Sequence, residues 1–151
     1  MVSPVLVLGC GNPARGDDGL GPALIQGIEI AALEGIETRV DYQLCVEDAL
    51  DIGSFTEVII VDASSSVLPP YQHYSLPQRL EPVTFDTHSL SPEALIHLAR
   101  TLFGATNQAS VLAIRGYHFE PFTESLSEPA RQNLKAALIY LVHRLGGGRR
   151  Y

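Results

Sequence analysis

The feature that most constrains the fold is a glycine-rich stretch, Gly9–Pro22, with the sequence GCGNPARGDDGLGP. It follows an apolar run at Val5–Leu8 and precedes a helical pattern that begins near Leu20. A buried strand, a glycine-rich turn and a helix in this order place the turn at the carboxyl edge of an α/β sheet, where ligands bind in such folds. The carboxylates of Asp17 and Asp18 make this turn suited to a ligand other than an anion.

The rest of the chain repeats the alternation of apolar strands and amphipathic helices. This pattern predicts one α/β domain over residues 1–151, with three layers and a mostly parallel sheet between helices. The predicted elements are strands at Val5–Gly9, Thr38–Gln43, Glu57–Val61 and Val111–Ile114, a possible edge strand at Tyr71–Leu76, a short helix at Val46–Ile52, and longer helices that begin near Leu20, after Ser91 and after Ser127. We expect these longer helices to end at Gly35, Gly104 and Leu145.

Charge and composition argue against several classes of protein. The formal net charge is −7, and the ten Lys and Arg residues form no run, which argues against nucleic acid and anionic membranes as partners. The sequence holds no apolar stretch of transmembrane length and no signal-peptide pattern at its start. Cys10 and Cys45 are too few for a disulfide framework. We therefore expect a cytoplasmic protein, and a monomer or weak oligomer.

Acidic residues and one histidine are predicted to meet at a single edge of the sheet. Asp17 and Asp18 follow the first strand, Asp62 ends the strand at Glu57–Val61, and His88 precedes the helix that begins after Ser91. Two carboxylates and one imidazole suit Mn, Fe, Ni or Zn, and the ligand types do not choose among them. Three protein ligands would leave open positions, as a catalytic metal requires.

Each of these residues also has a purely structural interpretation. Asp17 or Asp18 could cap the helix that follows, because Asp is a favoured N-cap residue. Asp62 could hydrogen-bond to loop amides, and His88 could bond to the backbone.

A dinucleotide-binding module is a further alternative. The segment GCGNPA fits the fingerprint G-x-G-x-x-A, and Asp41 could be the acidic residue that binds a ribose. Two features oppose this interpretation. Pro13 removes an N–H from the phosphate-binding turn, and Asp17 and Asp18 place negative charge where the pyrophosphate would lie.

Three motifs together resemble those of the hydrogenase maturation proteases, the endopeptidases that process the large subunit of nickel–iron hydrogenases. The motifs are GCGNPARGDDGLGP at 9–22, VDASSS at 61–66 and DTHSLSP at 86–92, in this order. The segment IRGYHFEPFTESLSEPARQNLKAAL at 114–138 is also similar to the end of that family's chains. The resemblance covers essentially the whole chain, and it implies a twisted, five-stranded, mostly parallel sheet between helices.

The resemblance also implies a site and a substrate. Asp18, Asp62 and His88 occupy the positions of the family's nickel-binding residues, with Asp at the first position where the family has Glu or Asp. The substrate would be a nickel-loaded large-subunit precursor, from which a C-terminal extension is removed. We expect metal-assisted hydrolysis, in which the metal polarises the scissile carbonyl or activates water and a free carboxylate transfers protons. Nickel would belong to the protease or arrive with the substrate.

Several roles remain open at this point. Besides Asp18, Asp62 and His88 as catalytic and metal-binding residues, the candidate substrate-binding residues are Gly11, Asn12, Asp17 and Tyr117. For Asp17 the alternatives are a structural role and that of general base in an aspartyl-type mechanism. The aromatic loop Arg115–Glu124 would either hold the substrate or cover the last helix. A protein of another class, a nickel-binding chaperone that does not cleave the precursor, would carry the same three metal ligands.

Overall fold

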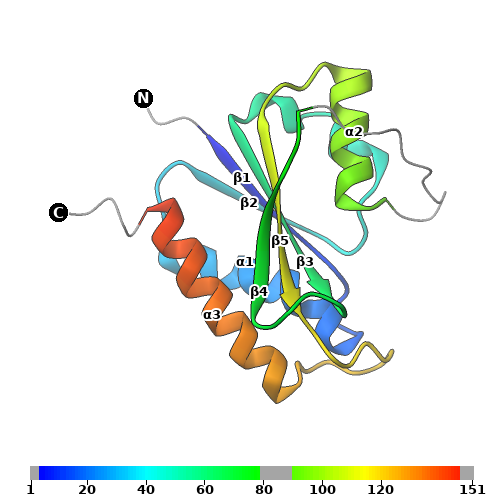
Figure 1. The fold of residues 1–151 in the computed structure, drawn as a ribbon, viewed down its shortest axis with the longest axis vertical. Coiled ribbons are helices and arrows are strands. Elements are labelled where there is room, and N and C mark those ends of the chain that lie inside the picture. The colour runs from blue at the N-terminus through cyan, green and yellow to red at the C-terminus, as the bar shows by residue number, and fades with distance from the viewer. Residues whose placement is uncertain (1–3, 79–89, 147–151) are drawn as a thin grey trace.

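The computed structural model describes residues 4–78 and 90–146, which form a five-stranded sheet in the order β2-β1-β3-β5-β4 (Figure 1). Four strands are parallel, and β4 at one edge runs antiparallel to β5. The strands are β1 (Val5–Cys10), β2 (Ile36–Asp41), β3 (Glu57–Ser64), β4 (Tyr71–Leu76) and β5 (Gln108–Arg115). The α-helices are α1 (Leu20–Ala31), α2 (Pro92–Phe103) and α3 (Glu128–Leu145), and the short 3₁₀ segments are η1 (Gly16–Gly19), η2 (Val46–Ala49) and η3 (Ile52–Ser54).

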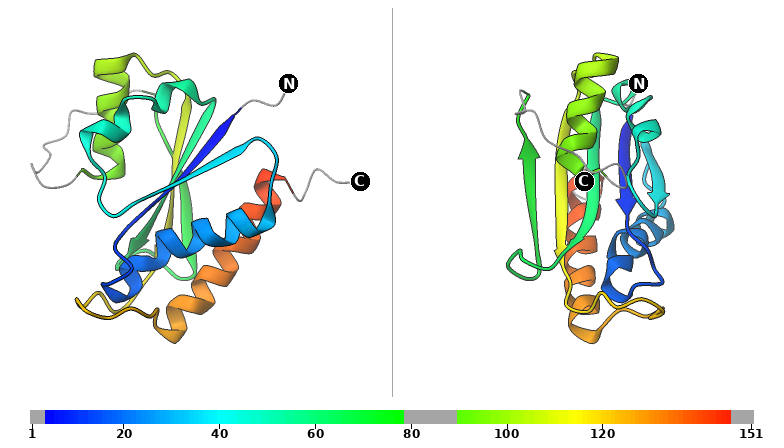
Figure 2. Two further views of the ribbon diagram at one scale, coloured as in Figure 1. Left: turned by 180° about the vertical axis from the view of Figure 1, so that it is seen from behind. Right: turned by 90° about the vertical axis from the view of Figure 1, so that its right-hand side faces the viewer.

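Helices cover both faces of the sheet, as the two views of Figure 2 show. Successive side chains of a strand point to opposite faces, so each central strand contributes to two cores. Leu6 and Leu8 of β1 lie in the core with α2, η2 and η3, whereas Val7 between them lies in the core with α1 and α3. The predicted three-layer α/β fold with a mostly parallel sheet is therefore confirmed.

Local signals identified the ends of two helices correctly. The hydroxyl of Ser91 accepts a hydrogen bond from the N–H of Ala94, and Gly104 closes α2 in the left-handed conformation with φ 68°. The hydroxyl of Ser127 accepts a hydrogen bond from the N–H of Ala130 at the start of α3. None of the helices within residues 4–78 and 90–146 has the length and apolar character needed to cross a bilayer.

Other boundaries differ from the prediction. Helix α1 ends at Ala31 rather than at Gly35, because Ala32 itself adopts the left-handed conformation, with φ 51°. Strand β2 begins at Ile36, opposite the first residue of β1, two residues before the predicted start. Strand β3 continues past Asp62 to Ser64, because β5 pairs along its whole length.

The predicted short helix at Val46–Ile52 is instead two 3₁₀ segments, η2 and η3. The carboxylate of Asp48 accepts a hydrogen bond from the N–H of Cys45, which fixes the first turn of η2. The N–H groups of Leu50 and Phe55 bond to carbonyls three residues earlier, at Glu47 and Ile52. These bonds are of the 3₁₀ type, so the chain turns tightly here without forming an α-helix.

Candidate functional site

The glycine-rich stretch leaves β1 at Cys10 and folds back on itself before α1 begins. Gly11 has φ 135°, and a Cβ at this position would overlap the backbone oxygen of Asp18. Only glycine therefore allows this close approach. The N–H of Asn12 then donates a hydrogen bond of 2.7 Å to Oδ2 of Asp18, which fixes the carboxylate beside the turn.

A cleft of about 580 Å³ opens at this edge of the sheet. Its lining includes Gly11, Asn12, Arg15, Asp18 and Asp62, together with residues 42–44 that follow β2. The structure thus brings together Asp18 and Asp62, and it places Gly11 and Asn12 beside them. The carboxyl ends of adjacent parallel strands meet at one edge, which is why residues far apart in the sequence converge here.

The third predicted metal ligand, His88, lies outside the described residues. Leu90, two positions later, lines the cleft, and its N–H donates a hydrogen bond of 3.3 Å to the carbonyl of Leu44. Leu90 is therefore attached to the loop that follows β2 and lines the same cleft.

Asp62 has the electrostatic environment of a functional carboxylate. Gly9 of β1 is level with Val61 of β3, so Cys10 and Asp62 are the next residues of the two strands. Burial raises the pKa of Asp62 to about 6; the negative charge of Asp18 adds to this shift, and the thiol of Cys10 opposes it. The environment thus penalises the charged form of Asp62, and a nearby cation would stabilise that form.

Neither cysteine has the environment of a nucleophile. Cys10 is buried, and burial followed by the charge of Asp62 raises the pKa of its thiol far above the usual value. Hydrogen bonding to Glu47, burial and the neighbouring Asp48 raise the pKa of Cys45 to about 11. Because the thiolate is the reactive form, these raised pKa values argue against a nucleophilic role for either cysteine.

Asp17 points away from the cleft into a closed pocket, here called the anchor pocket. Its side chain is completely buried, and it accepts hydrogen bonds from the N–H groups of Tyr117, His118 and Ser127 and from the hydroxyl of Ser127, at 2.7–3.1 Å. Burial alone would raise the pKa of Asp17, but the hydrogen bonds outweigh it and lower the pKa. Both oxygens are engaged, which favours a structural role over substrate binding or proton transfer.

Neither carboxylate caps the helix that follows. The N-cap of α1 is Gly19, which has no side-chain hydrogen bond, and η1 contains both Asp17 and Asp18. The capping interpretation is therefore wrong. Because η1 separates the turn from α1, the N-terminus of α1 also does not follow the turn directly, as a dinucleotide fingerprint would require.

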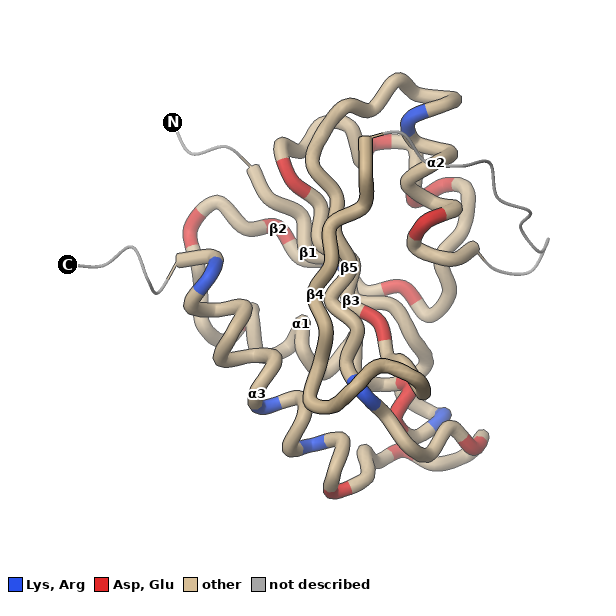
Figure 3. Tube along the Cα trace, viewed as in Figure 1, with Lys and Arg blue, Asp and Glu red and all other residues tan. Residues whose placement is uncertain are grey.

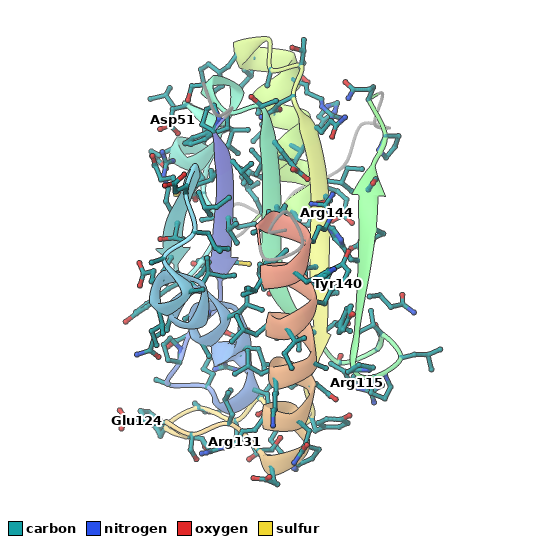
Figure 4. The ribbon with its side chains drawn as sticks, turned by 90° about the vertical axis from the view of Figure 1, so that its left-hand side faces the viewer. Asp51, Arg115, Glu124, Arg131, Tyr140 and Arg144 are labelled. Carbon is teal, nitrogen blue, oxygen red and sulfur yellow. The ribbon has the colours of Figure 1, made fainter. Side chains whose placement is uncertain are left out.

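The loop between β5 and α3 is fastened to the glycine-rich stretch. The N–H of Gly16 bonds to the carbonyl of Thr123, and the N–H of Thr123 bonds to the carbonyl of Ala14, at 2.7 and 3.0 Å. Arg115 and Glu124, at either end of this loop, lie at the same end of the molecule (Figure 4). The loop thus supports the turn that carries Asp18.

Tyr117 lies in this loop but does not line the cleft. Its ring stacks under the guanidinium of Arg115, 5.0 Å from the ring centroid, and its hydroxyl accepts a hydrogen bond of 3.1 Å from Asn133 of α3. These contacts match the alternative in which the loop covers the last helix. Phe122, by contrast, is 96% exposed and has φ 62°. A substrate role for the loop remains a prediction.

A second pair of carboxylates, which the sequence motifs do not indicate, lies at the end of β2. Asp41 ends β2, and ligand atoms of Asp41, Asp48 and Cys45 lie within 4.8 Å of one another. Burial, then hydrogen bonding to Asp48 and its charge, raise the pKa of Asp41 to about 6. The sequence fingerprint assigns Asp41 only a possible role in binding a ribose. The available signal was an acidic residue at the end of an edge strand, next to a loop with more acids.

A larger hollow, of about 1070 Å³, lies at the amino ends of the strands, between residues such as Val5, Gly35 and Glu57. These residues lie at or before the starts of β1, β2 and β3. Ligands of α/β sheets bind at the carboxyl ends of the strands, so we assign the site to the smaller cleft.

The fold and the cleft define a three-layer α/β protein with an acidic site at the carboxyl ends of β1 and β3. Neither a protein-family model nor a curated protein matches the sequence. Solved structures do match. A hydrogenase 2 maturation peptidase from a Thaumarchaeota archaeon has a TM-score of 0.69 and 23% identity, over 95% of this chain and 98% of that chain.

Two further solved structures have the same fold. The NiFe hydrogenase maturation protease HycI from Thermococcus kodakarensis has a TM-score of 0.73 and 16% identity, over 95% of this chain and 92% of that chain. The hydrogenase maturating endopeptidase HybD from E. coli has a TM-score of 0.69 and 19% identity, over 94% of this chain and 91% of that chain. The chain therefore has the fold of solved hydrogenase maturation proteases.

Proposed function

We propose that this protein is an endopeptidase that removes the C-terminal extension of a nickel–iron hydrogenase large-subunit precursor. The observation that carries the proposal is the convergence of Asp18 and Asp62 in one cleft, within the fold of solved hydrogenase maturation proteases. The sequence motifs that contain both residues support the same activity.

The residues of the cleft suit a divalent cation. Asn12 holds one oxygen of Asp18 and leaves Oδ1 without a hydrogen bond among the described residues. Burial and the charge of Asp18 disfavour the ionised form of Asp62 and raise its pKa. A bound cation would stabilise that ionised form. Asp18, Asp62 and His88 would hold the metal, and when bound, nickel would supply a Lewis acid that polarises the scissile carbonyl or lowers the pKa of water.

The chain's own groups would then position the substrate and the cation. The turn at Gly11 and Asn12 borders the cleft and would lie beside the scissile peptide. Burial raises the pKa of Asp62 to about 6 in the absence of a cation, and a bound cation would favour loss of this proton, so that Asp62 would act as a carboxylate ligand. The anchor pocket around Asp17 keeps the turn in place while this happens.

The test is to mix the purified protein with a nickel-loaded precursor and measure masses. The expected result is a large subunit that is shorter by its C-terminal extension. A matched reaction with Asp18→Asn should leave the precursor intact. A complex in which the precursor keeps its mass would instead indicate a non-cleaving nickel chaperone. The absence of both binding and cleavage would refute the proposal. Repeating the reaction with nickel-free precursor, with and without added nickel, determines whether the metal arrives with the substrate.

A further inference from the structure

Strand β2 forms one edge of the sheet and leads directly into the cleft. Among the described residues, β2 pairs only with β1, from Ile36 opposite Val5 to Asp41 opposite Cys10. The right-hand view of Figure 2 shows β2 as the outermost strand on its side. Residues 42–44, which follow β2, line the cleft together with Asp18 and Asp62. An extended chain laid along β2 would therefore reach the candidate site without a turn.

The outer side of β2 carries backbone groups that do not bond to β1. The N–H of Gly11 bonds to the carbonyl of Asp41, and the N–H of Val5 bonds to the carbonyl of Gly35, both at 3.0 Å. The odd-numbered residues of β2 therefore face β1. Because backbone groups alternate in direction along a strand, the N–H and C=O groups of Thr38 and Val40 face outwards. Such an edge is a template for an added strand.

The side chains along this edge suit apolar residues of an added strand. Val40 is 47% exposed and Tyr42 is 66% exposed, two positions apart. A hollow of about 230 Å³ between α1 and β2 lies at the other end of the strand, lined in part by Ile36 and Thr38. An added strand places alternate side chains on one face, so apolar residues at alternate positions would contact Val40 and Tyr42.

The charge of this region selects the occupant. Four acidic residues lie at the cleft end of β2: Asp41 and Asp48, whose ligand atoms are within 4.8 Å of each other, and Asp18 and Asp62 in the lining of the cleft, where Arg15 is the one basic residue among those described. The excess of acidic over basic residues is visible along the chain trace in Figure 3. Arg39 of β2 is already paired with acidic residues: its guanidinium lies 3.1 Å from a carboxylate oxygen of Glu37 and 2.7 Å from one of Asp51. An acidic edge favours a segment with basic side chains.

We propose that β2 is the docking strand for an extended segment of the precursor, which adds to the edge of the sheet and enters the cleft. The segment is extended, carries apolar residues at alternate positions, and has basic residues near the cleft. This inference rests on the proposed function, because it assigns a docking surface to the same substrate.

The substitution Val40→Pro tests the docking strand directly. Proline removes the outward N–H of Val40 and leaves the bonds to β1, as proline is tolerated at the solvent side of an edge strand. The expected result is about a tenfold rise in KM for the precursor, equivalent to one lost hydrogen bond, with kcat largely retained. An unchanged KM would overturn the inference. Circular dichroism checks that the variant is folded.

The other edge of the sheet provides a matched control. The carbonyl of Pro70 accepts a hydrogen bond from the N–H of Arg115, so alternation turns the N–H of Ser75 away from β5. Ser75→Pro makes the same chemical change on exposed β4, far along the sheet order from β2. It should leave KM unchanged. Equal losses of affinity in both variants would indicate a general effect of proline and overturn the specific role of β2.

Hydrogen exchange gives a measurement that does not depend on a folded proline variant. The Asp62→Asn protein is mixed with the precursor, and exchange is followed by mass spectrometry over residues 36–42. Binding along β2 should slow exchange at Thr38 and Val40. A complex that forms without slower exchange there would overturn the inference while leaving the proposed function intact. If the wild-type protein neither binds nor cleaves the precursor, the proposed function itself fails.

Discussion

Asp17 and Asp18 are neighbours in the sequence, yet they belong to two regions with opposite electrostatics. The anchor pocket surrounds Asp17 with hydrogen-bond donors and lowers its pKa. The cleft gives Asp18 one N–H donor and places it near Asp62, whose pKa is raised to about 6 by burial and by the charge of Asp18. One region is complementary to a negative charge, and the other accumulates negative charge. The first stabilises the loop, and the second is prepared for a cation.

The largest expected effect comes from removing a charge from the cleft. Asp18→Asn or Asp62→Asn should lower precursor cleavage by about 1,000-fold, which corresponds to about 4 kcal/mol of activation free energy. Asparagine keeps the size of the side chain but not the charge that a metal ligand needs. The assay is the rate of precursor shortening measured by mass spectrometry, at a temperature where the variants are folded.

Glu34→Gln is the matched control for this loss of charge. Glu34 is exposed and lines the hollow at the amino ends of the strands, away from the cleft, so its neutralisation should leave cleavage unchanged. Wild-type rates for Asp18→Asn would show that the first motif is not the metal site.

The next largest effect concerns stability and the anchor pocket. Asp17→Asn should reduce the free energy of unfolding by about 3 kcal/mol, because an amide leaves buried donors without an acceptor. Urea denaturation followed by circular dichroism measures the change. The folded variant should still cleave the precursor, in contrast to Asp18→Asn. Unchanged stability would contradict the structural role of Asp17.

The acid dependence of stability sharpens this prediction. The pKa of Asp17 is lowered on folding, so its stabilising contribution is present above the ordinary pKa of about 4 and is lost as pH falls through the lower folded pKa. Wild-type protein should therefore lose stability in this acidic range more steeply than Asp17→Asn. Ser127→Ala, which removes one of the donors to Asp17, should have an intermediate slope.

The contrast between the two regions also shows what sequence can predict. Asp18 and Asp62 were correctly expected at one edge, because parallel strands that alternate with helices end at the same side of a sheet. Ser91 and Gly104 were recognised because a cap depends on residues within one turn. The partners of Asp17 could not be found, since they lie about a hundred residues away and meet it only in the tertiary structure.

The missed features share the same cause. Ala32 closes α1 in a conformation that sequence assigns to Gly35, and β3 is extended by its pairing with β5 rather than by its own residues. The raised pKa of Asp41 depends in part on Asp48, which the turn of η2 brings close to the end of β2. The role of His88 as a third ligand stays a prediction.

The smallest predicted effect tests whether crowding of carboxylates, rather than burial alone, distinguishes the cleft side of the molecule. The pKa of Asp41 is raised on folding to about 6, by burial and by Asp48. Its contribution to stability is therefore present below its ordinary pKa of about 4 and is lost as pH rises through 6. Asp48→Asn removes the like charge and keeps an oxygen for the N–H of Cys45. This variant should be more stable than wild type by about 1 kcal/mol at pH 7, with no gain at pH 4.

Thermal melts at both pH values measure this difference, and Glu47→Gln is the matched control. Glu47 is exposed and adjacent to Asp48, but it is not among the groups that shift the pKa of Asp41. Its neutralisation should produce less than half the gain of Asp48→Asn at pH 7. An equal gain in both variants would mean that the net charge of −7 destabilises the fold as a whole. In that case the raised pKa of Asp41 would not reflect a specific pair, and the contrast with the anchor pocket would be limited to Asp18 and Asp62.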